Sequence, residues 1–206
     1  MGTRNLTAVI VNNTPVIAQY GQWDGYPSGQ GATVLAFCRE HLKTLKGRAA
    51  FQEKLTRCRW ENGTEVQAFC ESIGCKDGWM DMNQAAKYHR AFPYMNRDHG
   101  GKILSLVNDA PPDAEIILMN SFEFGYNGLF CKYAYVVDLT AAVLEAYVGD
   151  QKTPPPEGQR FAGKGPNDSG YYPVHLAGKW DLSKPPAQRT FERAIKKFAE
   201  QARNSK

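Results

Sequence analysis

Two prolines near the centre of the chain separate two kinds of hydrophobic pattern, and this change most constrains the fold. Neither a helix nor a paired strand can continue through the break, Asp109–Pro112, because proline lacks the backbone N–H. Between Ala32 and the break, apolar residues recur every three or four positions, as in amphipathic helices. After it, Glu115–Asn120, Phe130–Asp138 and Val143–Val148 have the composition of strands. Separate blocks of helices and strands indicate an α+β fold.

The amino-terminal segment predicts a β-hairpin. Leu6–Val11 is rich in residues that suit strands, Asn12 and Asn13 favour a tight turn, and Pro15–Tyr20 resumes the apolar stretch. With the later strands, we expect a small antiparallel sheet of about four or five strands with about six helices packed on it. A chain of 206 residues can bury a core without disulfides, so a single domain spanning residues 1–206 is predicted.

Five helices are predicted between the hairpin and the break. They are Ala32–Leu45, Arg48–Trp60, and three that begin near Thr64, near Asp81 and at Asp98. Thr64 with Gln67, and Asp81 with Gln84, have the spacing of a capping box. The side chains expected on the core-facing sides are Leu35, Cys38, Leu42, Leu45, Phe51, Leu55, Cys58, Val66, Phe69, Cys70, Ile73, Met82, Ala85, His89, Ile103, Leu104 and Val107.

The last quarter of the chain begins with a segment rich in proline and glycine. Residues 151–186 are predicted to form a long surface excursion. Ala187–Ala202 then has the pattern of an amphipathic helix, with Phe191, Ile195 and Phe198 on one side. Because those three side chains need cover, we expect this helix to dock on the rest of the protein.

The charge balance gives a mild preference for anionic partners. The chain has 25 basic and 21 acidic residues, a net charge of +4. The densest basic group, within residues 189–197, shares its helix with Glu192 and Glu200. A solvated helix face is therefore favoured, and nucleic acid is not an expected partner.

Other features argue against membranes, disulfides and metals. No run of about 18 apolar residues could cross a membrane, and the start of the sequence lacks a secretory signal, so a cytoplasmic protein is expected. The 5 cysteines include no CxxC pair, which favours a reducing compartment. The 4 histidines are dispersed, and the common phosphate-binding, metalloprotease and serine-nucleophile motifs are absent. No metal site and no cofactor are predicted.

The segment Tyr20–Gly31, which we call the aromatic loop, holds the residues most typical of a binding site. It joins a strand to a helix, where free backbone N–H groups can meet an anion, and we expect neither a helix nor a strand within it. Gly29 and Gly31 are predicted to let a ligand approach the main chain. Trp23 and Tyr26 offer flat faces for a base or sugar ring. The other candidate ligand-binding residues of the loop are Tyr20, Gln22, Asp24, Ser28 and Gln30.

A plainer interpretation of the aromatic loop remains open. Gly25 and Pro27 could form a turn, Trp23 and Tyr26 could fill the core, and Ser28 could cap the following helix. Against this, the loop commits many polar groups to a simple connection, which favours binding.

Residues 96–101, the second glycine segment, form another candidate site. Asp98 is placed to cap the fifth helix, and Arg97 beside that helix start could hold a phosphate or carboxylate. An exposed arginine at an ordinary helix start is an equally open interpretation. Arg4, ahead of the first strand, needs a carboxylate or open water, and Asp24, Asp98 and Asp138 are the available partners.

These motifs resemble a family of uncharacterised proteins carried by bacteriophages, bacteria and some fungi. The resemblance rests on the Met1–Arg4 start, the aromatic loop with its Trp-Asp-Gly-Tyr-Pro centre, the second glycine segment, and Tyr133–Asp138 with Leu144–Tyr147. It covers roughly residues 1–149, and the chain departs from the family pattern at His99 and Gly101. It implies a possible phage setting but no particular chemistry.

The leading hypothesis is binding of a small anionic, nucleotide-like ligand. Trp23 and Tyr26 would stack on it, and the loop amides with Ser28, Arg4 and Arg97 would hold its charge. In a phage setting such a protein would sequester a host signalling molecule. One alternative is a hydrolase or transferase with Asp24 or Asp98 as general base. Another is a protein that inhibits a host protein by surface contact.

Overall fold

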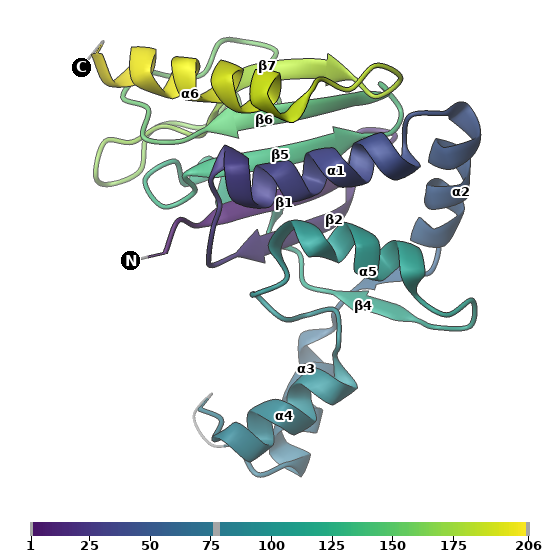
Figure 1. Ribbon diagram of the computed structural model, residues 1–206. Helices are drawn as coiled ribbons and strands as arrows, with labels where there is room; N and C mark the ends of the chain where they lie inside the picture. The colour runs from purple at the N-terminus through teal and green to yellow at the C-terminus, as the bar shows by residue number, and fades with distance from the viewer. Residues whose placement is uncertain (1, 76–78, 205–206) are drawn as a thin grey trace.

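The computed structural model describes residues 2–75 and 79–204. A five-stranded sheet carries helices on one face, and two helices project away from it as an arm (Figure 1). The prediction of an α+β fold is confirmed. Within the described residues, no helix is long and apolar enough to span a lipid bilayer.

The main sheet has the strand order β2-β1-β5-β6-β7. Its strands are β1 (Asn5–Val11), β2 (Thr14–Gly21), β5 (Tyr133–Asp138), β6 (Val143–Val148) and β7 (His175–Asp181). β1 and β2 form the predicted hairpin, and Asn12 and Asn13 adopt φ of 50° and 61° at its turn. Neighbouring strands are antiparallel except β1 and β5, which are parallel. The sheet is therefore mixed, and the prediction of an antiparallel sheet is wrong at this central pair.

A second, small sheet corrects another prediction. It consists of β3 (Cys58–Trp60) and β4 (Ile116–Leu118), which pair in parallel. Helical spacing predicted a helix over Arg48–Trp60, but that helix ends at Leu55. Pairing with β4, a contact between distant parts of the chain, draws the last residues into an extended conformation instead.

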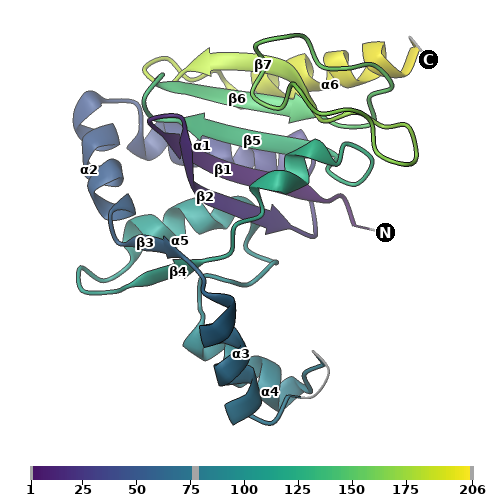
Figure 2. The same cartoon turned by 180° about the vertical axis from the view of Figure 1, so that it is seen from behind.

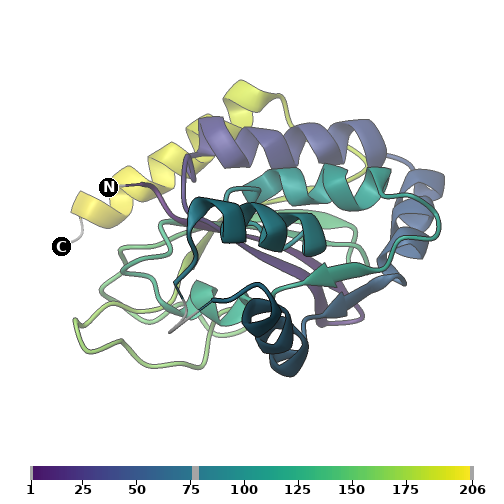
Figure 3. The same cartoon turned by 90° about the horizontal axis from the view of Figure 1, so that it is seen from below.

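Three helices cover one face of the main sheet (Figures 1 and 3). The helices of the protein are α1 (Ala32–His41), α2 (Leu45–Leu55), α3 (Gly63–Ser72), α4 (Met82–Ala91), α5 (Ile103–Asp109) and α6 (Gln188–Asn204). α1, α5 and α6 bury Leu35, Leu104 and Phe191 in one apolar cluster with Ile17 and Tyr135 of the sheet. The expected docking of the carboxy-terminal helix is thus observed, because Phe191 is fully buried.

On the opposite face, the proline- and glycine-rich segment lies over one end of the sheet (Figures 2 and 3). This segment was predicted to be a long surface excursion, yet it buries Phe161 completely and also contributes β7 to the sheet. The Phe161 ring packs on Tyr147 at 5.0 Å and on Phe122 at 5.2 Å between ring centroids. Leu6 and the other inward residues of β1 on this face need such cover, and the excursion supplies it.

A buried charge cluster also attaches the excursion to the sheet. Arg160 lies 2.7 Å from the Asp138 carboxylate and 2.9 Å from the Glu145 carboxylate. The Tyr147 hydroxyl donates to Glu145 at 2.7 Å, and Lys179 lies 3.5 Å from the other oxygen of Glu145. One arginine therefore pairs with two carboxylates on the neighbouring strands β5 and β6.

Helices α3 and α4 form an arm that projects from the sheet domain (Figures 1 and 2). The capping box of Asp81 and Gln84 is confirmed, with both reciprocal hydrogen bonds present. The one predicted at Thr64 is wrong, because the side chain of Asn62 caps α3 instead. Aromatic contacts hold the arm together. The ring centroids of Phe69 and Phe92, for example, lie 5.3 Å apart.

Several side chains expected in the core are not buried. Leu45, Met82 and His89 are exposed, and Cys58, Val66, Phe69, Cys70, Ile73 and Ala85 are only partly buried. Most of them belong to the arm, whose helices pack on each other rather than on the sheet. Helical spacing predicts which side of a helix is apolar, whereas the depth of burial depends on what covers that side.

Candidate functional site

The aromatic loop is ordered, and its last five residues form a helical turn, Pro27–Gly31, that continues into α1. The expectation that no helix forms in this segment is therefore wrong for its second half, where proline at the first helical position is compatible with the turn. Trp23 and Tyr26 are 51% and 52% exposed. The alternative in which these rings fill the core is therefore wrong.

The loop is held in place by the protein itself. The buried Tyr135 hydroxyl donates to the Gly25 carbonyl at 2.9 Å. The Gly25 N–H donates to the Thr3 carbonyl, and the Gln30 N–H donates to the Asp24 carbonyl, both at 2.8 Å. These bonds join the loop to the start of β1 and to the middle of the sheet.

The glycines of the loop face protein atoms. A Cβ on Gly29 would lie 2.3 Å from the Asp24 carbonyl oxygen, and one on Gly31 would lie 2.8 Å from the Tyr135 ring. Real Cβ atoms do not approach other atoms so closely. Glycine at these two positions lets the chain pack on itself, and this packing accounts for both glycines without a ligand.

Replacing Gly29 with alanine should lower the free energy of unfolding by about 1 to 3 kcal/mol. The new methyl group would overlap the Asp24 carbonyl and displace the loop. Gly63→Ala is the matched control, because no atom lies within 4 Å of its Cβ position and alanine favours the helix. Urea unfolding measures both variants, and equal stability would contradict this account of Gly29.

The second glycine segment lies beside the aromatic loop. The Gln22 N–H donates to the Arg97 carbonyl at 3.3 Å, and the Gly101 N–H donates to Gln30 Oε1 at 2.7 Å. A Cβ on Gly100, whose φ is +48°, would lie 2.5 Å from the Gln30 side chain. Close packing on Gln30 and the positive φ account for Gly100, whereas a Cβ on Gly101 would lie 2.9 Å from the Val34 side chain of α1.

Asp98 does not cap α5. A short 3₁₀ turn, Gly100–Lys102, precedes that helix, which begins at Ile103, and its first turns have no side-chain cap. The backbone N–H of Asp98 instead donates to the Asn96 side chain at 2.9 Å. The carboxylate of Asp98 is exposed to solvent.

The candidate side chains of the two segments differ in their surroundings. The Tyr20 hydroxyl donates to the Gln22 side chain, and the centroid of the Tyr20 ring lies 4.9 Å from that of Phe124. Gln30 is bound to the second glycine segment. The exposed candidates are Trp23, Asp24, Tyr26, Ser28, Arg97 and Asp98. Internal contacts therefore occupy three of the polar side chains.

Arg4 has none of the expected carboxylate partners. It makes no ion pair within the described residues, and Asp138 pairs with Arg160 instead. The Arg4 guanidinium lies over the Phe130 ring, 4.9 Å from its centroid. Its Nε atom is buried and has no hydrogen-bond partner in the described part of the chain.

Three adjoining hollows form a groove at one end of the main sheet, which we call the sheet-end groove. Their volumes are about 290, 190 and 230 Å³. The first two share Tyr26, Tyr133 and Ala199, and the second and third share Thr3 and Lys132. The groove therefore runs from α6, past the aromatic loop, to the start of β1.

Aromatic rings and cations line this groove. Tyr26 and Tyr133 have ring centroids 6.4 Å apart, and Arg4 and Lys132 lie farther along. Lys132 Nζ is 2.6 Å from the Asp150 carboxylate. Sequence reasoning selected Arg4, Tyr26 and Ser28 but missed Lys132, because strand pairing alone brings the start of β5 beside that of β1.

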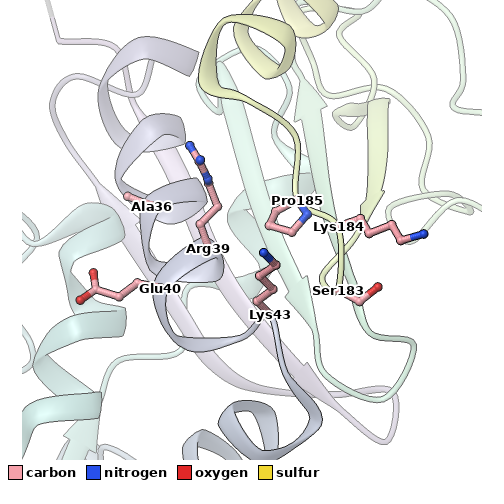
Figure 4. Close-up of a pocket in the computed structure, with 7 residues that line it drawn as sticks. All are labelled: Ala36, Arg39, Glu40, Lys43, Ser183, Lys184 and Pro185. Atoms are coloured by element: carbon pink, nitrogen blue, oxygen red, sulfur yellow. The ribbon is translucent and has the colours of Figure 1, made fainter.

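A second hollow, of about 650 Å³, lies at the far end of α1 between that helix and residues 183–185 (Figure 4). Lys43 points towards Pro185, whereas Glu40 and Lys184 point away. Basic residues here have a structural explanation, because cations stabilise the carboxyl end of a helix. With no aromatic ring in its lining, this hollow is the weaker candidate for the expected ligand.

Comparisons of the chain with protein-family models, with curated proteins and with solved structures find no match. The resemblance to phage, bacterial and fungal proteins therefore stays a prediction.

Proposed function

We propose that the protein binds a small anionic ligand with a planar ring, such as a nucleotide, in the sheet-end groove. One observation carries the proposal: the three adjoining hollows are lined by two tyrosine rings and by the cations Arg4, Lys132 and Lys196. In a phage setting, such binding would sequester a host signalling molecule.

The groove offers a contact for each part of such a ligand. Tyr26 is half exposed and can lie against a base. Arg4 would receive the anionic group, and Lys132, which also pairs with Asp150, lies beside it. The Arg4 Nε atom supports this role in particular, because a buried donor without an acceptor costs free energy that a ligand oxygen would recover.

In the proposed site, replacing Arg4 with glutamine should weaken nucleotide binding by about 10- to 150-fold, the equivalent of one charge-assisted hydrogen bond. Titration calorimetry with nucleoside mono-, di- and triphosphates measures the affinity. Tyr26→Ala should also weaken binding, and affinity should fall as salt rises. Arg97→Gln is the control, because Arg97 is exposed and does not line the groove. Equal losses for Arg4→Gln and Arg97→Gln, or no binding by any nucleotide, would contradict the proposal.

The structure offers less support for a hydrolase or transferase. Asp24 and Asp98, the candidate general bases, do not line the groove. The carboxylates that do are Asp150, Glu192 and Glu200, and Asp150 already pairs with Lys132. Recovery of a bound nucleotide unchanged after incubation would favour binding over turnover.

Inhibition of a host protein by surface contact is the second candidate function. Trp23 is half exposed on a loop that internal hydrogen bonds hold in place. An aromatic side chain presented in this way is typical of the centre of a protein interface. Trp23→Ala would then abolish a stable protein complex without changing nucleotide affinity.

A further inference from the structure

The carboxyl end of α3 places two cysteines side by side. The Cys75 N–H donates to the Cys70 carbonyl at 2.9 Å, and the Gly74 N–H donates to the Glu71 carbonyl at 3.0 Å. Gly74 has a φ of +78°. This pair of hydrogen bonds around a left-handed glycine is the Schellman motif. In this motif, the side chains at the positions that Cys70 and Cys75 occupy here contact each other across the turn.

The two thiols are in contact and partly accessible. Burial raises the pKa of Cys70, and the neighbouring Cys75 thiol raises it further through Coulombic repulsion and a hydrogen bond. Both residues are partly exposed. Cys38 and Cys131 are fully buried, and burial raises the pKa of each well above its usual range. An oxidant therefore reaches the Cys70–Cys75 pair more readily than the buried thiols.

We propose that Cys70 and Cys75 form a reversible disulfide that clamps the turn at the carboxyl end of α3. A Schellman turn already brings the two side chains together, so the bond requires little movement of the backbone. Hydrogen peroxide is the oxidant that we consider. One thiolate attacks a peroxide oxygen, the O–O bond breaks, and a sulfenic acid forms while the leaving hydroxide becomes water. The second thiolate then attacks the sulfenic sulfur and displaces the oxygen as another water.

The clamp would act on the whole arm. The Gln84 side chain, in the first turn of α4, donates to the carbonyls of Ile73 at 3.2 Å and Gly74 at 2.9 Å. The turn that the disulfide would close is thus bonded directly to the start of α4. Trp79 and Met82, which are 83% and 90% exposed, lie beside this junction in the sequence. Oxidation would restrict how the arm presents these two side chains.

Peptide mapping tests the bond directly. Residues 60–76 form a single tryptic peptide that contains Cys70 and Cys75 and no other cysteine. The full-length protein is reduced, treated with hydrogen peroxide, alkylated with N-ethylmaleimide and digested. We expect this peptide to become lighter by two hydrogens and to carry no alkyl group, while a thiol reductant added before alkylation restores both sites. Since the raised pKa of Cys70 leaves little thiolate at neutral pH, the reaction should accelerate as pH rises.

Two further measurements complete the test. Cys70→Ser and Cys75→Ser should each abolish the cross-link, whereas Cys58→Ser, which removes a partly exposed thiol outside the pair, should preserve it. Hydrogen exchange at the turn formed by residues 70–75 should slow on oxidation of the wild-type protein. Alkylation of both cysteines after oxidation, a sulfinic acid at one of them, or a disulfide between two chains would overturn the proposal. So would a cross-link that leaves hydrogen exchange at the turn unchanged.

Discussion

Replacing Arg160 with methionine should lower the free energy of unfolding by about 3 to 5 kcal/mol, the cost of leaving buried charges without a partner. The Arg160 side chain is 14% exposed, and those of Asp138 and Glu145 are 11% and 7% exposed. Methionine fills much of the same volume but leaves the two carboxylates without their shared cation. Lys179, at 3.5 Å from Glu145, compensates only one of them. Urea unfolding at neutral pH measures the loss.

Lys164→Met is the matched control for this change. Lys164 belongs to the same excursion and pairs with Glu123, but the two side chains are 49% and 76% exposed. An exposed ion pair contributes less than about 1 kcal/mol, so this variant should unfold almost like the wild type. Similar losses in the two variants would mean that burial does not decide the strength of the Arg160 contacts.

Replacing Phe161 with alanine should lower the free energy of unfolding by about 3 to 5 kcal/mol, as expected for removal of a fully buried ring. Phe161 is 0% exposed and stacks on Phe122 with an interplanar angle of 30°. Gly125 lies so close that a Cβ there would be 2.3 Å from the Phe161 ring, so little can move in to fill the cavity. Denaturant unfolding, with tryptophan fluorescence as the signal, measures the effect.

Phe130→Ala is the control for the ring deletion, because Phe130 is 44% exposed. Its loss should lower the free energy of unfolding far less, since nearly half of its surface is already exposed to solvent. If both phenylalanines proved equally dispensable, the excursion would be a peripheral loop, as the sequence pattern predicted, rather than the cover of one sheet face.

Local patterns predicted local structure well. The hairpin of β1 and β2 follows from the turn residues Asn12 and Asn13, which lie between two apolar stretches. The capping box of Asp81 needs only residues that are three apart. The prediction of which side of α6 is apolar was also correct, because the periodicity of a helix follows from its regular turn geometry.

Contacts between distant segments account for the failures. The parallel pairing of β1 with β5 joins residues such as Asn5 and Tyr133, and no local signal specifies a partner so far along the chain. β7 has little strand pattern of its own and forms because β6 offers an open edge. The first strand of the small sheet replaces part of a predicted helix for a similar reason.

The candidate site divides in the same way. The sequence by itself determined that the aromatic loop joins a strand to a helix, and residue type alone selected Arg4, Tyr26 and Ser28. Only the tertiary structure decided that the loop glycines pack against protein atoms and that Lys132 lies in the same groove as Arg4. The physical reason is that residue type determines what a side chain can do, whereas strand pairing determines which side chains meet.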